Sequence, residues 1–365
     1  MKKMFALLVV WTVCVCTSSF VGAQDIPGGL LRTYDGKGFY HHRFRDVEQK
    51  PYIDFLGTPG GNNILRDMPP DHYHHHGLMM AIRINGVNFW EESGYPGKEQ
   101  ITSAGVRSKI DCTPNGTFVD ESLALNWITP RGTLLLEEQR LIRAQRKSNS
   151  DPTLMTWLMV FSCPDSREQA GINPEIVPPD HSAELDEKTT LHGSYYNGFG
   201  LRFDETMDFG GRFFYSEGSE ELPIGHPLHT NVLCRWAAYT AKLHGQPVTV
   251  ALYDLGGSVT SKDVLKQKQV FQALEQDILK HPFALVVDEP KIKSLPMVVY
   301  ALGDPTEQRT NAYLSATMNI FREPLELAKD QSVVLRYGIA IWDGERTPQE
   351  VEEVLQAWER SRNGK

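Results

Sequence analysis

Glycine-containing turn signals recur along the chain at short intervals, and the segments between them are rich in β-forming residues. Two of these signals are Asp35-Gly36 and Asn85-Gly86, and an Asn-Gly pair favours a two-residue type I′ hairpin. No apolar period of 3.6 residues is sustained from residue 101 to residue 163. The pattern predicts antiparallel strands joined by hairpins, as in a large β-sandwich.

Two segments carry helical signals. Residues 261–280 have a rough apolar stripe. Near the C-terminal end, Thr347 is the expected N-cap, Pro348 the first helical residue and Glu350 the partner that completes a capping box. There is no βαβ rhythm, no GxGxxG after a strand and no P-loop, which argues against nucleotide binding. We expect one mainly β domain over residues 24–365, a large antiparallel sandwich with a few helices.

The first residues have the pattern of a signal peptide. Lys2 and Lys3 precede an apolar run at 5–16, and small residues lead to an expected cut near Ala23, ahead of Gln24. No later segment has 18 uninterrupted apolar residues, so we expect no membrane span in the mature chain. The sequence therefore predicts a signal peptide over residues 1–23 and an exported protein, periplasmic or extracellular.

Charge and cysteine content exclude some classes of partner and bond. The chain has 46 acidic and 37 basic residues, a net charge of −9, whereas a nucleic-acid partner requires a basic surface. The mature chain keeps Cys112, Cys163 and Cys234, an odd number that we interpret as small buried side chains rather than a bridge. Residues 164–190 are rich in proline and charge and predict a surface excursion or lid.

The most conspicuous stretch is residues 69–78, which reads PPDHYHHHGL. Four of the 12 histidines fall between His72 and His76. Imidazole titrates near neutral pH and is the commonest metal ligand in proteins. The stretch therefore indicates proton transfer, metal binding or recognition of a polar ligand.

For a polar ligand we expect acid–base groups beside flat aromatic rings, because histidine and carboxylate exchange protons and aromatic faces pack against sugar rings. The expected ligand is a carbohydrate or another small polar molecule. We assign acid–base chemistry to Asp71, His74, His75 and Glu217, and ligand binding to His72, His76, Trp90, Tyr196 and Arg202.

A metal site and a purely structural loop are the alternatives. If the stretch were a strand, His72, His74 and His76 would share one face while His75 pointed back, and three imidazoles suit a divalent metal such as zinc, copper or iron. Such a site would favour a metal-dependent oxidoreductase. In the structural alternative, hydrogen bonds fix the loop and Asp71 caps backbone donors.

The histidine stretch also carries a family resemblance. Together with the Asn-Gly-Val-Asn-Phe-Trp segment it resembles a bacterial family labelled methane oxygenase PmoA-like, over about residues 51–344. The resemblance implies a β-supersandwich like that of galactose mutarotase, which is found in many carbohydrate-active proteins. Its blocks in this sequence are 71–78, 85–90, 198–202, 216–218, 235–239 and 335–344.

This chain departs from the family pattern at two positions in the stretch. Tyr73 stands where the family usually has proline, and His76 stands where it usually has arginine.

The sequence predicts an exported protein that either converts a sugar, as a hydrolase, lyase or epimerase, or binds it as a non-catalytic module. The metal-dependent oxidoreductase remains the third hypothesis.

Overall fold

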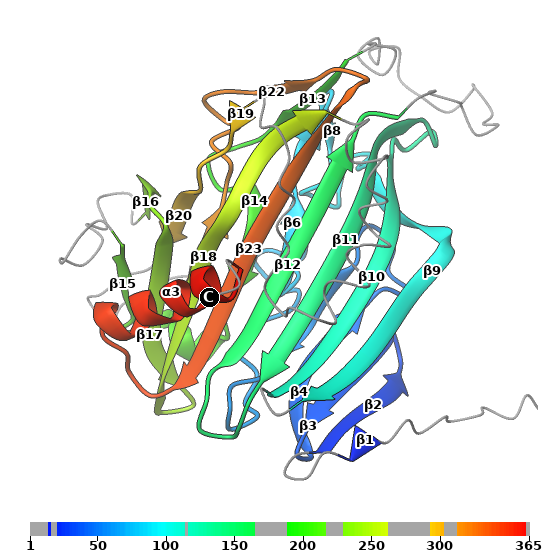
Figure 1. Ribbon diagram of the computed structural model, residues 1–365. Helices are drawn as coiled ribbons and strands as arrows, with labels where there is room; N and C mark the ends of the chain where they lie inside the picture. The colour runs from blue at the N-terminus through cyan, green and yellow to red at the C-terminus, as the bar shows by residue number, and fades with distance from the viewer. Residues whose placement is uncertain are drawn as a thin grey trace, which may run out of the picture.

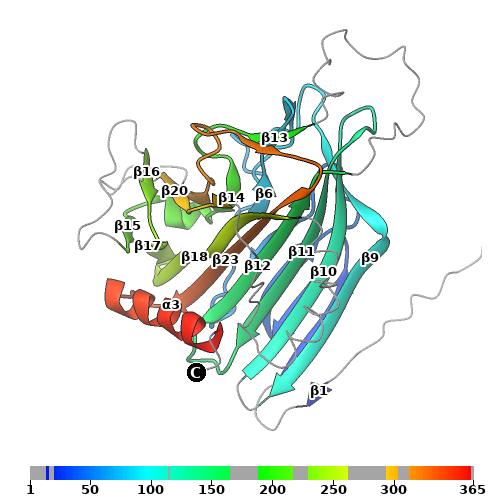
Figure 2. The same ribbon diagram turned by 45° about the horizontal axis from the view of Figure 1, so that its top comes forward.

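The described part of the chain folds into antiparallel sheets with a helix near the C-terminal end, so the predicted mainly β fold is confirmed. Two large sheets stack face to face as a sandwich, and a small third sheet lies at one end of them (Figures 1 and 2). The computed structural model describes residues 14–15, 20–113, 116–164, 188–216, 229–261, 293–302 and 312–362.

The first large sheet contains the N-terminal hairpins and the strand that follows the histidine stretch. Its order places strands side by side that are far apart in the sequence. Across this ten-stranded sheet, within the described residues, the strands are β1 (Cys14–Val15), β2 (Phe20–Ile26), β3 (Gly29–Tyr34), β4 (Lys37–Arg43), β5 (Tyr52–Leu56), β6 (Leu78–Ala81), β14 (Gly198–Arg202), β21 (Tyr313–Ala316), β20 (Val298–Leu302) and β16 (His229–Leu233).

The second large sheet is built mostly from long strands (Figure 1). Across this nine-stranded sheet, again within the described residues, they are β15 (Arg212–Tyr215), β17 (Trp236–Leu243), β18 (Gln246–Ser261), β23 (Gln331–Asp343), β12 (Thr153–Ser162), β11 (Leu134–Arg146), β10 (Gly116–Ile128) and β9 (Lys98–Thr113), with β19 (Lys293–Ser294) paired to β18.

The small sheet divides the apolar segment that follows the histidine stretch. Residues 78–84 form two strands separated at Ile82, because β6 pairs in the ten-stranded sheet whereas the next strand pairs in the small sheet. Asn85 and Gly86 have φ of 49° and 84°, and they join the two short strands as the predicted hairpin turn. The small sheet contains β22 (Leu325–Leu327), β13 (Thr189–His192), β7 (Arg83–Ile84) and β8 (Val87–Asn88).

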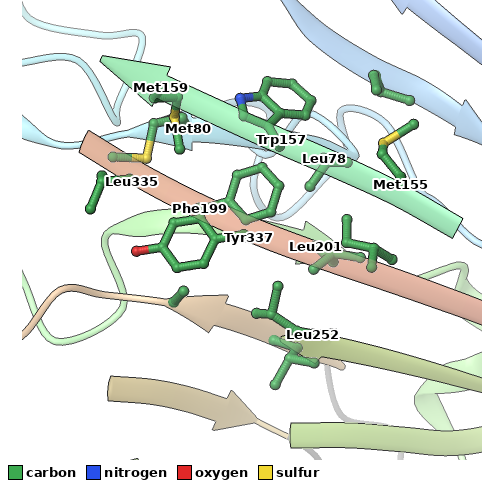
Figure 3. Packing of buried hydrophobic residues seen from close by; sticks show 14 of the residues in the cluster. Leu78, Met80, Met155, Trp157, Met159, Phe199, Leu201, Leu252, Leu335 and Tyr337 are labelled. Carbon is green, nitrogen blue, oxygen red and sulfur yellow. The ribbon is translucent and has the colours of Figure 1, made fainter. Parts of the chain in front are cut away.

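Alternate residues of facing strands fill the space between the two large sheets. Phe199 of β14 stacks on Tyr337 of β23 with ring centroids 5.2 Å apart, and Trp157 of β12 packs against Phe199 at 5.2 Å (Figure 3). Met80 of β6 joins this core, so its neighbour Met79 faces the other side of the sheet. The ten-stranded sheet therefore has a core-facing side and an outer side.

A buried ion group lies between the sheets. Arg140 of β11 donates from Nε and Nη2 to the two oxygens of Glu138 at 2.7 and 2.8 Å, and from Nη2 to Glu99 at 2.9 Å. Its Nη1 donates to the Pro51 carbonyl, next to β5 of the other sheet. All three charged side chains are fully buried, so they depend on one another for compensation.

Helix α3 (Pro348–Arg362) covers part of the outer side of the nine-stranded sheet (Figure 1). The predicted capping box is confirmed. The Glu350 carboxylate accepts from the Thr347 N–H at 2.8 Å, and the Thr347 hydroxyl accepts from the Glu350 N–H at 3.3 Å. Trp358 on the buried face of the helix packs edge-on against Tyr253 of β18.

Several predictions lie at or beyond the edges of the described residues. The predicted helix at 261–280 and the excursion at 164–190 fall almost wholly outside them. The predicted cut ahead of Gln24 lies within β2, and residues 24–26 of that strand pair with β3. The signal peptide and export stay predictions.

Two findings concern cysteines and membrane spans. The described side chains of Cys112, Cys163 and Cys234 are free thiols. Cys163 and Cys234 are buried as interpreted, whereas Cys112 is only half-buried. Within the described ranges, no helix is both long and apolar enough to cross a bilayer.

Candidate functional site

The histidine stretch forms a loop whose two ends are joined to each other and to β14. We call residues 67–76 the histidine loop and residues 71–74 its tip. The stem is formed by Arg66, Asp67, His76 and Gly77, which lie where the two ends of the loop meet. Asp67 and His76 pair as an antiparallel bridge. The Arg66 N–H donates to the Arg202 carbonyl at 3.0 Å, and the Arg202 N–H donates to the Gly77 carbonyl at 2.7 Å. Backbone hydrogen bonds therefore hold the stem independently of the tip side chains.

His76 uses both ring nitrogens inside the stem. Its Nδ1 lies 2.8 Å from Asp67 Oδ1 and its Nε2 lies 2.9 Å from Glu92 Oε1, while the ring stacks on Tyr52 at 4.2 Å. Burial lowers the pKa of His76, but the hydrogen bonds to the two carboxylates outweigh it and raise the pKa above the ordinary value. His76 is thus engaged by the protein, and its assigned role in ligand binding stays a prediction.

Lys50 links the stem to the segment that carries Trp90. Its Nζ lies 2.9 Å from Glu92 Oε1 and donates to the carbonyls of Phe89 and Trp90 at 3.2 and 3.1 Å. Burial raises the pKa of Glu92, but the hydrogen bond from His76 and the charge of Lys50 hold it at about 2. The position of Trp90 is therefore coupled to the stem by a buried ion network.

Three imidazole rings gather at and beside the tip. His75 stacks on His72 at 4.6 Å and meets His74 edge-on at 4.6 Å. The backbone turns here: the His72 N–H donates to the Pro69 carbonyl, and the His75 N–H donates to the His72 carbonyl. The expectation that His72, His74 and His76 share one strand face is wrong, since residues of a turn do not alternate as those of a strand do.

This arrangement does not assemble the expected metal ligands. Among the residues that the structure describes, no three His, Cys, Asp or Glu side chains are grouped so that they could hold a metal ion. His76 directs both nitrogens at carboxylates, and His72 and His75 lie face to face. The three histidines of the metal hypothesis therefore act in two separate groups.

An aromatic wall lies beside the tip, formed by Trp90, Tyr196, Tyr300 and Tyr313. Ring centroids of Trp90 and Tyr196 are 5.3 Å apart, and those of Tyr300 and Tyr313 are 6.1 Å apart. His75 joins the wall by stacking on Tyr313 at 5.6 Å and by an edge contact with Trp90 at 5.5 Å. Tyr300 of β20 and Tyr313 of β21 cluster with the outward side chains of β6, so the wall stands on the outer side of the ten-stranded sheet.

Gly200 of β14 makes room for this wall. A Cβ at this position would overlap the Tyr313 hydroxyl and lie 2.6 Å from Tyr313 Cζ. The carbonyl of Tyr196 accepts a hydrogen bond from the Ser315 hydroxyl at 3.1 Å, which ties the main chain at Tyr196 to β21. The missing side chain of Gly200 is therefore a packing requirement of the site.

We expect Gly200→Ala to lower the free energy of unfolding by about 1–3 kcal/mol, as is usual when a filled core is overpacked. Thermal unfolding of variant and wild type measures the difference. Tyr313→Phe in the Gly200→Ala background should recover part of the loss, because it removes the hydroxyl that the added methyl meets. Identical unfolding of Gly200→Ala and wild type would contradict this account of the wall.

Arg202 lies next to the wall and the histidine loop. It is the cross-strand neighbour of Tyr313 and is only 1% exposed. Its charge influences both Asp71 and His75. The Nε and Nη2 atoms of Arg202 are buried and have no hydrogen-bond partner in the described part of the protein.

The ionisable groups near the tip differ in charge state. Burial, reinforced by the neighbouring imidazoles and Arg202, lowers the pKa of His75 to about 2, so this ring is neutral at physiological pH. Asp71 Oδ2 lies 3.0 Å from His72 Nδ1 in an exposed pair. Burial raises the pKa of Asp71, but the close approach of His72, together with the charge of Arg202, outweighs it and lowers the pKa below the ordinary value. The His75 ring is therefore neutral, whereas the Asp71 carboxylate is ionised.

The structure brings together most of the residues that were assigned from the sequence, while His76 belongs to the stem and Glu217 lies outside the described residues. The residues that meet at the tip and wall are Asp71, His72, His74, His75, Trp90, Tyr196 and Arg202.

Sequence reasoning missed several residues that shape the site. Asp67 and Glu92 are 9 and 16 residues away from His76 in the sequence, and only the fold brings their carboxylates to its ring. Tyr300 and Tyr313 come from distant strands and carry no local signal. Lys50 acts through carbonyl groups, which a sequence does not mark.

Comparison with known proteins gives a family without an assigned activity. A family model described as a family of unknown function (DUF6807) matches residues 31–356. No curated protein matches the chain. The matched range includes the whole histidine loop and aromatic wall, while the PmoA-like resemblance and the mutarotase-like architecture stay predictions.

Proposed function

We propose that this chain, which belongs to the family of unknown function DUF6807, is an exported protein that binds a carbohydrate or sugar derivative at the histidine loop and aromatic wall. The observation that carries the proposal is the contact of Trp90 with the half-buried rings of both His74 and Tyr196. A pyranose ring has flat apolar faces that pack on aromatic rings, and its hydroxyls require polar groups beside them. The PmoA-like resemblance and its mutarotase-like fold support the same ligand class by analogy.

The Asp71–His72 pair supplies acid–base chemistry to this proposal. Asp71 Oδ2 lies 3.0 Å from His72 Nδ1, and an imidazole beside a carboxylate can take up or release a proton during a reaction. Such a pair suits epimerisation, elimination or glycosidic cleavage of a bound sugar. Glycoside hydrolysis commonly uses two carboxylates, and the second one assigned, Glu217, lies outside the described residues.

Binding of sugars by the purified protein tests the proposal. A glycan array identifies bound sugars, and calorimetric titration then gives their dissociation constants. We expect His74→Ala and Tyr196→Ala to weaken binding about tenfold each, which corresponds to roughly 1.4 kcal/mol. Both side chains are half-buried, so their truncation leaves the inter-sheet core intact. His244→Asn is the matched control, because His244 is exposed in a turn with φ of 50° that asparagine adopts readily.

Product analysis separates an enzyme from a binding module. If the bound sugar is converted, Asp71→Asn should abolish conversion while binding persists. If the sugar is recovered unchanged by wild type, the protein is a binding module. Binding of no sugar, or equal binding by the site variants and the control, would overturn the proposal.

A further inference from the structure

Arg202 differs from other buried arginines because one edge of its guanidinium is unused. Of the described side chains, it is the one with two buried nitrogen atoms that lack a hydrogen-bond partner. Arg143 places the same Nε–Nη2 edge against Asp120, with bonds of 2.6 and 2.7 Å. Arg140 does the same with Glu138, at 2.7 and 2.8 Å. The Nε–Nη2 edges of Arg140 and Arg143 are therefore each paired with a carboxylate, whereas the same edge of Arg202 is not.

The acids near Arg202 are arranged toward other groups. Asp208 lies 3.4 Å from Arg66 Nη1, and Asp71 lies 3.0 Å from His72 Nδ1. Burial lowers the pKa of Arg202, and the charges of Asp208 and Asp71 oppose this only in part. Neither acid accepts a hydrogen bond from Nε or Nη2 of Arg202.

An unused charged edge in a buried position has a definite chemical complement. Burying a charged donor without an acceptor costs free energy, and such groups are rare in folded proteins. Guanidinium remains protonated in proteins, so the edge cannot relieve the cost by losing its proton. A carboxylate accepts two parallel hydrogen bonds from this edge, whereas a hydroxyl matches it less well.

We propose that the ligand is an acidic carbohydrate of the uronic acid type, whose carboxylate binds the Nε–Nη2 edge of Arg202. This inference rests on the proposed carbohydrate function and narrows its ligand class. The sugar ring then lies beside His75, whose ring stacks on Tyr313, the cross-strand neighbour of Arg202. His75 has a buried Nδ1 without a hydrogen-bond partner, which is available to a ring hydroxyl.

Entry of the carboxylate requires a small movement of the loop tip. Arg202 is 1% exposed, whereas the side chain of Asp71 at the tip is 43% exposed. The stem stays in place during this movement, because its hydrogen bonds to Arg202 are made by backbone groups. The tip is thus the part of the loop that yields to the ligand.

Calorimetric titration with matched acidic and neutral sugars tests the inference. The probes are mono- to trisaccharides of D-glucuronate and D-galacturonate, their methyl esters, and the corresponding glucose and galactose sugars. For wild type we expect at least one acid to bind tenfold or more tightly than both its ester and its neutral counterpart. We expect Arg202→Lys to remove this preference by weakening the acid about tenfold more than it weakens the neutral sugars, because lysine keeps the charge but loses the planar edge.

Controls keep the two proposals distinguishable. Arg45→Lys alters an exposed arginine paired with Asp25 and should leave every constant unchanged. If Arg202→Lys fails to fold, the comparison of acid with ester on wild type decides alone. Equal affinity for acid, ester and neutral sugar would overturn the uronate inference and leave the carbohydrate function standing. Binding of no sugar of any class would overturn both.

Discussion

We expect the free energy of unfolding of His76→Arg to stay constant above about pH 6.5, the ordinary pKa of histidine. Wild type is expected to lose stability over the same pH range. In wild type the imidazolium of His76 lies between Asp67 and Glu92, with Lys50 also bound to Glu92. A guanidinium can make both ion pairs and stays charged at every relevant pH. Urea unfolding of both proteins between pH 6 and pH 9 measures the difference.

The sign follows from the direction of the pKa shift. The carboxylates raise the pKa of His76 in the folded protein, although burial opposes them. The resulting stabilisation is complete below the unfolded pKa and declines as pH rises through the raised folded pKa. His76→Gln, which lacks the charge, should be about 2 kcal/mol less stable than wild type at pH 6. That gap should narrow by pH 9. Parallel pH curves for wild type and His76→Arg would contradict this role for His76.

Arg140→Met is expected to lower the unfolding free energy by about 3–5 kcal/mol, the usual effect of breaking a buried ion group by removing one partner. Glu99 and Glu138 would then share the inter-sheet space without the guanidinium that now binds both. Burial already raises the pKa of Glu99 above its ordinary value, although the charge of Arg140 opposes this. Urea unfolding at pH 7 measures the loss, which is large against the 5–15 kcal/mol typical of a domain.

A matched variant distinguishes charge from packing in the same position. Arg140→Met combined with Glu99→Gln and Glu138→Gln removes the uncompensated charges and should recover much of the stability. For comparison, Arg143→Met with Asp120→Asn removes both charges of a second ion pair, in which Arg143 is 3% and Asp120 11% exposed. No difference between the single and the triple variant would show that lost packing against Trp157, over which Arg140 lies at 5.2 Å, sets the cost.

The parts of the fold that the sequence predicts are those with local causes. The Asn85-Gly86 turn needs positive φ at both residues, and the capping box needs only Thr347 and Glu350 at the right spacing. The break at Ile82 has no such local cause. It arises because β6 and β7 find partners in different sheets, and those partners lie far away in the sequence.

The same distinction separates the predicted from the unpredicted parts of the site. The histidines were found because they cluster in the sequence, and Trp90 because it ends a recognisable segment. Tyr313 could not be found in this way, because only the pairing of β21 with β14 brings it to Arg202. The different role of His76 also depended on tertiary structure, since Asp67 and Glu92 approach it only after the chain has folded.

The division of the histidine loop into stem and tip has a consequence for how this protein can change. The stem is closed by main-chain bonds of residues 66, 77 and 202 and by the ion pairs of His76. Residues 71–74 take no part in those contacts to β14 or Glu92. Under the proposed function, substitutions there can therefore alter which ligand is accepted while the scaffold stays the same. New specificities would then be accessible by single steps that do not require compensating changes in the sandwich.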